Sequence, residues 1–440
     1  MQTTTAYEPL VQFRRAVYRT LGHRKDSLFE LLEAALAAPG PATLVWLSLA
    51  PAFRRAWSSA PDALADGRLD PERCRQLVQQ YLAAQPLSGR PAWALDGTVW
   101  PRPAAQTSPE RTYGHRSAAG IPQAGVVPAW EYEWLVAVPE PGSSWALPLD
   151  VRRRGPGAGT PTALASALLR AALARRPADA ARPVVALDCG YDPVQLAHAH
   201  LDADLLVRLR SNRVFFGPPG PYQGRGAPRR YGARFALSDP MTYGPPDRGA
   251  SLEDPRFGRV RVEVWEGRRA RGGADVPFTL VQVRVARLPR RSTPPAPLWL
   301  TWIGGALPTD LLDLWRWYGL RFTAEHGFRF LKQALGWTTV RPRDPAAADR
   351  WSWLLALGLW ELWVARPLLA DQRLPWERPL PPARLTPGRV RRAVPGLLAQ
   401  VGTPARPPTP RGKAPGRSPG QCPGPRRRYP VARRRPEHAA

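Results

Sequence analysis

Two short apolar segments that each reach an aspartate constrain the fold of this chain more than any other feature. The segments are PAWALDGTVW (91–100) and PVVALDCG (183–190), and the aspartates are Asp96 and Asp188. Short apolar runs of this kind are typical of buried strands. Because a carboxylate inside a sheet would lack water, each aspartate is expected where its strand ends, at the edge of the sheet. Taken singly, each could instead cap the turn that follows it.

The segments around these two strands predict an α/β core. Strand patterns follow the first aspartate in 131–138 and 144–153, and a strong helical pattern covers 162–176. A second helical pattern near 193–201 and a strand pattern in 204–216 follow the second aspartate. Three strands, helix, strand, helix, strand is the order of a mixed sheet with crossover helices. The two aspartates would then leave adjacent positions of one sheet.

Changes in composition divide the chain into five segments. Residues 1–88 have helical patterns, and 89–216 contain the first part of the core. Residues 217–305 combine Pro, Gly and Arg with alternating strand patterns, helical patterns return in 306–372, and 373–440 are rich in Pro and Arg. We therefore expect a helical N-terminal region and a core interrupted by a β-rich insertion. The last segment is expected to be a flexible, disordered basic tail, because its composition cannot form a packed core.

The net charge points to nucleic acid as a partner. The chain has 63 Lys and Arg residues against 35 Asp and Glu, a formal charge of +28, and Arg greatly outnumbers Lys. Arginine suits contact with phosphate through two hydrogen bonds. A high-GC genome would also enrich Arg, Ala, Pro and Gly, but it does not account for the net charge. Cys74, Cys189 and Cys422 are far apart and have neither disulfide-framework nor zinc-site spacing.

The most apolar late segment does not indicate a membrane protein. WSWLLALGLWELWVA (351–365) is short for a membrane span and contains Glu361. We expect it to be a buried helix. The first residues lack the apolar stretch of a signal peptide. The sequence thus predicts a cytoplasmic protein without a membrane partner.

The segment YGLRFTAEHGFRFLK (318–332) places four polar groups on one side of a predicted helix. At 100° per residue, Tyr318, Arg321, Glu325 and Lys332 fall within about 60° of one another. Arg321 and Glu325 could form an ordinary ion pair between residues four apart in a helix. That interpretation leaves the spacing of Tyr318 and Lys332 unexplained.

Asp96, Asp188 and Glu325 are the candidate catalytic residues and metal ligands. Three carboxylates within a few ångströms of one another would repel unless a divalent cation neutralised them. Oxygen ligands without Cys or a His cluster favour Mg²⁺ or Mn²⁺. Two such ions could activate the attacking oxygen and stabilise the leaving oxygen of a phosphodiester. The predicted chemistry is phosphoryl transfer.

The spacing Tyr318, Arg321, Glu325, Lys332 resembles the Y-R-E-K signature of DDE transposases of the IS4 and IS701 type. The match has no gap, and it accompanies two upstream acids at strand ends and a β-rich insertion. The resemblance covers roughly residues 90–365. It implies an RNase H-like catalytic core that holds two divalent metal ions on the three acids.

The same resemblance implies roles for the other site residues and for the partners. Arg321 and Lys332 would bind phosphates near the cut end, and Tyr318 would pack beside them. The N-terminal helices would bind the terminal inverted repeats of a bacterial insertion sequence, and a homodimer would hold both ends near the nucleoid. Each end would be cut by water, and the freed 3′-OH would attack target DNA.

Trp265, Trp299 and Trp302 of the insertion are candidates for stacking on an extruded DNA base. Two alternatives to a transposase remain. One is an RNase H-like nuclease without strand transfer, and the other is a DNA-binding descendant that has lost catalysis. Matched inverted repeats flanking the gene would favour transposition over both.

Overall fold

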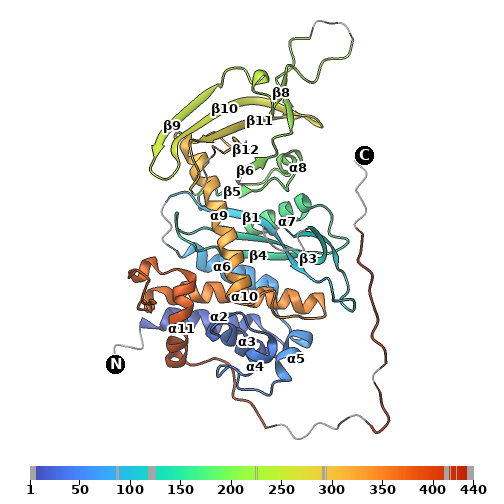
Figure 1. The fold of residues 1–440 in the computed structure, drawn as a ribbon, viewed down its shortest axis with the longest axis vertical. Helices are drawn as coiled ribbons and strands as arrows, with labels where there is room; N and C mark the ends of the chain where they lie inside the picture. Colours follow the sequence, from blue (N-terminus) through green and yellow to red (C-terminus); the bar gives the residue numbers. More distant parts are fainter. Residues whose placement is uncertain are drawn as a thin grey trace.

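The computed structural model stacks a β-rich end, a central sheet and a helical end along its longest axis (Figure 1). It describes residues 6–85, 89–116, 125–222, 224, 226–289, 293, 295–410, 416, 418–422 and 424–433. The helical end contains α2 (Glu8–Thr20), α3 (Lys25–Ala37), α4 (Leu44–Ser48), α5 (Ser59–Asp66) and α6 (Pro71–Ala83). The predicted helical N-terminal region is therefore confirmed.

The central sheet has the strand order of an RNase H-like core. Its strands are β1 (Ala92–Pro101), β2 (Thr112–Arg116), β3 (Gly125–Ala137), β4 (Leu147–Arg154), β5 (Val184–Leu187) and β6 (Asp204–Leu209). They run β4, β3, β1, β5, β6 across the sheet, with β2 beside β4 on the same edge of β3. β1, β5 and β6 are parallel, whereas β3 is antiparallel to its neighbours. The connecting helices are α7 (Pro161–Leu173) and α8 (Pro193–His198). The predicted mixed α/β sheet is confirmed.

The insertion extends this sheet instead of forming a detached unit. β7 (Val214–Phe216) directly precedes the predicted insertion. The elements of the insertion are β8 (Arg234–Ala236), the 3₁₀ turn η1 (Pro240–Thr242), β9 (Arg248–Asp254), β10 (Gly258–Ala270), β11 (Gly273–Val285) and β12 (Leu298–Ile303). β12 pairs with β6, and β11 and β10 follow it outward. The predicted β-rich insertion is confirmed, and its hydrogen bonds with β6 tie it to the core.

Two long helices connect the three layers. α9 (Leu312–Gln333) leaves the insertion and crosses the sheet over β1 and β5 (Figure 1). α10 (Pro345–Ala365) packs against β4 on one side and against α2, α3 and α5 on the other. It is apolar all round because almost every face is covered. The apolar segment 351–365 is thus a buried helix, and no helix in the described part of the chain is long and apolar enough to cross a membrane.

The expectation of a flexible tail from residue 373 onward is wrong for part of that segment. The described residues there include η3 (Pro382–Arg384) and α11 (Pro387–Val401), which packs on α10 and α3. Val390, Val394 and Leu397 are buried at helical spacing, and the surrounding Pro and Arg hid this pattern. Further on, the backbone N–H of Tyr429 donates to the Gln106 carbonyl at 2.8 Å.

Candidate functional site

The parallel pairing of β1 with β5 brings Asp96 and Asp188 to the same edge. The pairing covers Ala92 to Leu95 on β1 and stops where Leu95 faces Leu187. Asp96 and Asp188 are the next residues of their strands, so both carboxylates lie just past the last shared position. One detail differs from the prediction. β1 does not end at Asp96 but continues to Pro101, paired only with β3.

Arg321 of helix α9 links Glu325, on the same helix, to this edge of the sheet. One guanidinium nitrogen of Arg321, Nη1, donates to Oδ2 of Asp96 at 3.0 Å, and Nη2 donates to Oε1 of Glu325 at 2.7 Å. The Arg321 side chain is 4% exposed, Asp96 is 17% exposed and Glu325 is 48% exposed. The ordinary helix ion pair considered from the sequence therefore exists, but the same guanidinium also binds an acid of the sheet.

The remaining predicted residues surround this ion pair. The Arg321 guanidinium carbon lies 5.8 Å from the centre of the buried Tyr318 ring. Lys332 donates from Nζ to Oγ1 of Thr98 at 2.6 Å and so ties the end of α9 to β1. Asp188 has its own arginine, because Nη1 of Arg208 on β6 lies 3.4 Å from Oδ1 of Asp188. Contacts of these residues with DNA remain predictions.

Burial and neighbouring carboxylates perturb the first acid. Burial raises the pKa of Asp96 to about 6, against an attraction to Arg321 that lowers it; Asp188 and Glu325 raise it further. Burial disfavours the charged form of Arg321, but Tyr318 and the acids outweigh this effect and raise its pKa. A cationic neighbour stabilises the charged form of a buried carboxylate, and in this structure the neighbour of Asp96 is the Arg321 guanidinium.

The donor set fits a divalent metal, but the arrangement does not yet form a complete metal site. The three acids offer oxygen ligands of the kind Mg²⁺ and Mn²⁺ prefer. However, no group of three or more Asp, Glu, His or Cys side chains among the described residues is placed to hold a metal ion. Arg321 instead donates hydrogen bonds to two of the three acids.

Sequence reasoning missed a buried pair that supports the turn carrying Asp188. Oη of Tyr191, three residues after Asp188, donates to Oε2 of Glu133 on β3 at 2.6 Å. Both side chains are at most 5% exposed. Gly97 lies beneath this carboxylate, since a Cβ there would be 3.2 Å from both Glu133 oxygens. One indication was Gly97, a small residue that faces Glu133 on the neighbouring strand. The hydrogen-bond partner of Tyr191 could not be deduced from spacing.

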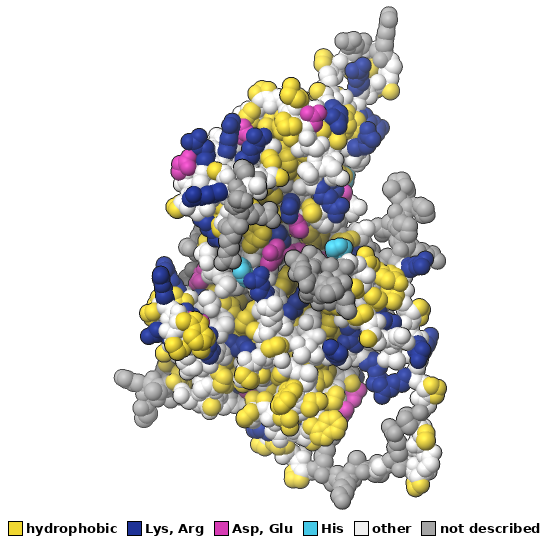
Figure 2. Space-filling model, viewed as in Figure 1, with side chains coloured by type: hydrophobic (Ala, Val, Ile, Leu, Met, Phe, Trp, Pro, Cys, Tyr) yellow, Lys and Arg dark blue, Asp and Glu magenta, His cyan; other side chains and the backbone are white. Residues whose placement is uncertain are grey.

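An open cleft borders the site where β1 continues past Asp96. It has a volume of about 730 Å³ and is lined by Asp96, Asp188, Glu133, Lys332 and the exposed stretch of β1. On the face shown in Figure 2, acidic side chains gather in the middle, between the β-rich insertion and the helical end. The cleft gives a substrate access to Asp96 and Asp188.

The structure corrects the expectation for the three tryptophans. Trp265, Trp299 and Trp302 are at most 3% exposed. Trp265 and Trp299 pack with Phe235 and Tyr243 in one core of the insertion. Trp302 stacks on Trp317 of α9. A ring covered on both faces has no surface for a DNA base, so these residues stabilise the insertion.

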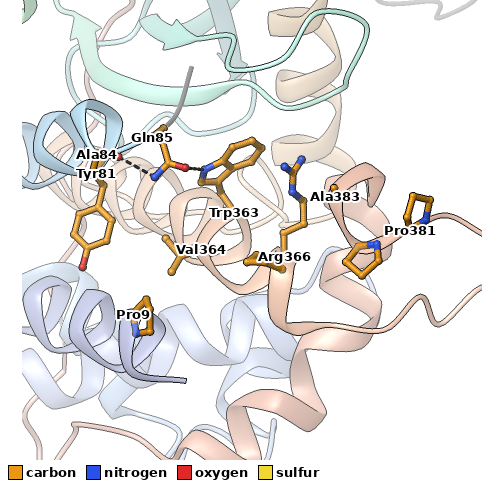
Figure 3. Close-up of a pocket in the computed structure, with 11 residues that line it drawn as sticks. Pro9, Tyr81, Ala84, Gln85, Trp363, Val364, Arg366, Pro381 and Ala383 are labelled. Carbon is orange, nitrogen blue, oxygen red and sulfur yellow. Dashed lines mark hydrogen bonds between the residues drawn. The ribbon is translucent and has the colours of Figure 1, made fainter. Parts of the chain in front are cut away.

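A second pocket, between the N-terminal helices and the end of α10, lies apart from the acids (Figure 3). Nε1 of Trp363 donates to Oε1 of Gln85 at 3.0 Å, and Gln85 donates to the Tyr81 carbonyl. No Asp, Glu, His or Cys lines it among the described residues.

The model of one protein family matches most of this chain. It describes the DDE superfamily endonucleases and matches residues 16–269, more than half of the sequence. The matched part contains Asp96 and Asp188, and Glu325 lies beyond it. No curated protein matches the chain. DDE endonucleases act on DNA and use divalent metal ions. The chain belongs to the DDE superfamily of endonucleases.

Proposed function

We propose that this protein is a DNA transposase of the IS4 and IS701 type. It hydrolyses one strand at each end of an insertion sequence, and the freed 3′-OH attacks target DNA in a cut-and-paste reaction. One observation carries the proposal. Asp96 and Asp188 lie past the shared end of β1 and β5, and Arg321 of α9 links Asp96 to Glu325 within the Tyr318, Arg321, Glu325, Lys332 spacing.

The side chains divide into ligands and phosphate-binding groups. Asp96, Asp188 and Glu325 would supply oxygen ligands to two Mg²⁺ or Mn²⁺ ions, which would polarise the attacking oxygen and stabilise the leaving one. Arg321 and Lys332 are the groups on α9 that would bind phosphate oxygens near the cut. Phosphate binding fixes the position of the strand relative to the acids.

The remaining parts of the proposal concern assembly on DNA. The N-terminal helical region, residues 1–88, would bind the terminal inverted repeats, and a homodimer would hold the two ends together. The formal charge of +28 supports DNA binding, because each phosphate contact made by Lys or Arg releases counterions. This binding should weaken steeply as salt is added.

The experiment that tests the function is cleavage of a labelled duplex carrying the gene's own flanking DNA, in Mg²⁺ and in EDTA. Wild type should cut at one defined end only with Mg²⁺ and then join that end to a second duplex. Glu325→Gln should bind the duplex but not cut it. Asp313→Asn is a matched control, because Asp313 is another acid of α9 that pairs with Arg316. Normal cutting by Glu325→Gln would remove the central claim.

A nuclease without strand transfer is the second candidate, since the family match concerns an endonuclease. Cutting without joining in the same assay would select it. Binding without any cutting would identify a descendant that has lost catalysis.

A further inference from the structure

Arginine side chains bind all three acids of the site. Arg321 donates to Asp96 and Glu325 at 3.0 and 2.7 Å. Arg208, on a different element, lies 3.4 Å from Asp188. The two guanidinium groups offset two of the three negative charges, which is part of what divalent ions would do.

The hydrogen bonds of Arg321 are incomplete in this arrangement. Arginine has five N–H donors, and Nε of Arg321 is buried without a hydrogen-bond partner. A buried donor left unpaired is unfavourable, and a phosphate offers several oxygens to a guanidinium. Arg208 is 45% exposed and faces the acid from the insertion side, where DNA could reach it. Arg208 is therefore accessible to a DNA phosphate, and Arg321 has one donor still unpaired.

We propose that Arg321 and Arg208 exchange partners when DNA binds. Without DNA they bind Asp96, Glu325 and Asp188 and keep divalent ions from binding tightly. Phosphates of the bound strand take over the two guanidinium groups, and the carboxylates become free to bind metal. This inference rests on the proposed function, and it adds Arg208 to the residues that bind the DNA backbone. It makes metal binding and DNA binding mutually dependent, because coupling between two ligands is reciprocal.

The first test uses the wild-type protein. Mn²⁺ binding is measured by electron paramagnetic resonance with and without a duplex of the gene's flanking DNA, and the duplex alone is subtracted. We expect DNA to tighten Mn²⁺ binding about ten-fold or more, in line with the effect of a close opposite charge on a carboxylate. Equal Mn²⁺ affinity with and without bound DNA would overturn the proposal.

The second test removes the guanidinium groups in the absence of DNA. Arg321→Gln should bind Mn²⁺ about ten-fold more tightly than wild type, and Arg208→Gln should show a smaller gain because this arginine is farther away and more exposed. Arg316→Gln is the matched control, since Arg316 lies on the same helix and pairs with Asp310 and Asp313. Unchanged or weaker Mn²⁺ binding by folded Arg321→Gln would overturn the proposal.

The cleavage assay distinguishes a failure of this inference from a failure of the proposed function. In one outcome, wild type cuts in a metal-dependent way while its Mn²⁺ affinity changes neither with DNA nor with the Arg321→Gln substitution. That result would reject the exchange of partners but not the proposed transposase function. Absence of both cutting and Mn²⁺ binding in every variant would reject both.

Discussion

Replacing Tyr191 by Phe should destabilise the protein in a way that depends on pH. The hydroxyl is buried and donates to Glu133 at 2.6 Å. Burial raises the pKa of Glu133 to about 7, and the Tyr191 hydrogen bond lowers it. At about pH 8.5 Glu133 is charged, and a hydrogen bond to a charged group contributes ~1.5–3 kcal/mol. At about pH 5 the carboxyl is protonated in the folded state, and the loss should be only ~0.5–1.5 kcal/mol.

The assay is urea unfolding followed by tryptophan fluorescence at both pH values. The sign follows from proton linkage: without the hydroxyl the folded-state pKa of Glu133 rises further, so the variant loses more stability than wild type as pH increases. The same variant should cut DNA more slowly at unchanged DNA affinity, because the turn carrying Asp188 is held less firmly.

Two variants control this experiment. Tyr113→Phe removes a hydroxyl from a side chain that is 48% exposed and should change neither property. Glu133→Gln keeps an acceptor for Tyr191 without the charge, so its stability should vary less with pH than that of wild type. Identical urea midpoints for Tyr191→Phe and wild type at both pH values would refute the reasoning.

Two further predictions concern buried groups near and far from the site. Glu33 shares the buried Arg14 with another glutamate, and burial raises the pKa of Glu33 from 4.5 to about 7. The folded state therefore binds more protons than the unfolded state in this range, and wild type should lose ~3 kcal/mol of stability as pH rises through it. Glu33→Gln should lack this loss in urea unfolding at several pH values. Gly97→Val should place atoms against Glu133, lower the free energy of unfolding by ~1–3 kcal/mol and reduce cleavage in the flanking-DNA assay.

The sequence predicted the features of the site that depend on local patterns. Apolar runs located the two strands, and helical spacing placed Tyr318, Arg321 and Glu325 on one element. The continuation of β1 past Asp96 was missed because a charged residue interrupts the apolar run. Beyond Leu95, β1 no longer pairs with β5, and this leaves the aspartates at the edge of the shared sheet. The residue pattern of a single strand does not show where its pairing with a neighbour stops.

Contacts between distant residues account for most of the rest. Arg321 and Asp96 are separated by 225 positions, and Tyr191 and Glu133 by 58. Periodicity shows which face a side chain occupies but not what lies opposite. The tryptophans of the insertion illustrate the same limit, since aromatic residues suit both a core and a stacking surface, and only the packing of Phe235 and Tyr243 around Trp265 and Trp299, and of Trp317 on Trp302, decides between them.

The buried charge of Asp96 should lower the stability of the folded protein, although Asp96 is a proposed catalytic residue. In metal-free protein, burial raises its pKa from 3.8 to about 6 despite the attraction of Arg321. Between these two values the folded state binds more protons than the unfolded state, so stability falls by ~3 kcal/mol as pH rises through this range. Asp96→Asn should therefore abolish cleavage and yet unfold at a higher urea concentration than wild type at about pH 8 in EDTA. A variant that is less stable than wild type under these conditions would mean that the ion pair with Arg321 outweighs the burial of the charge.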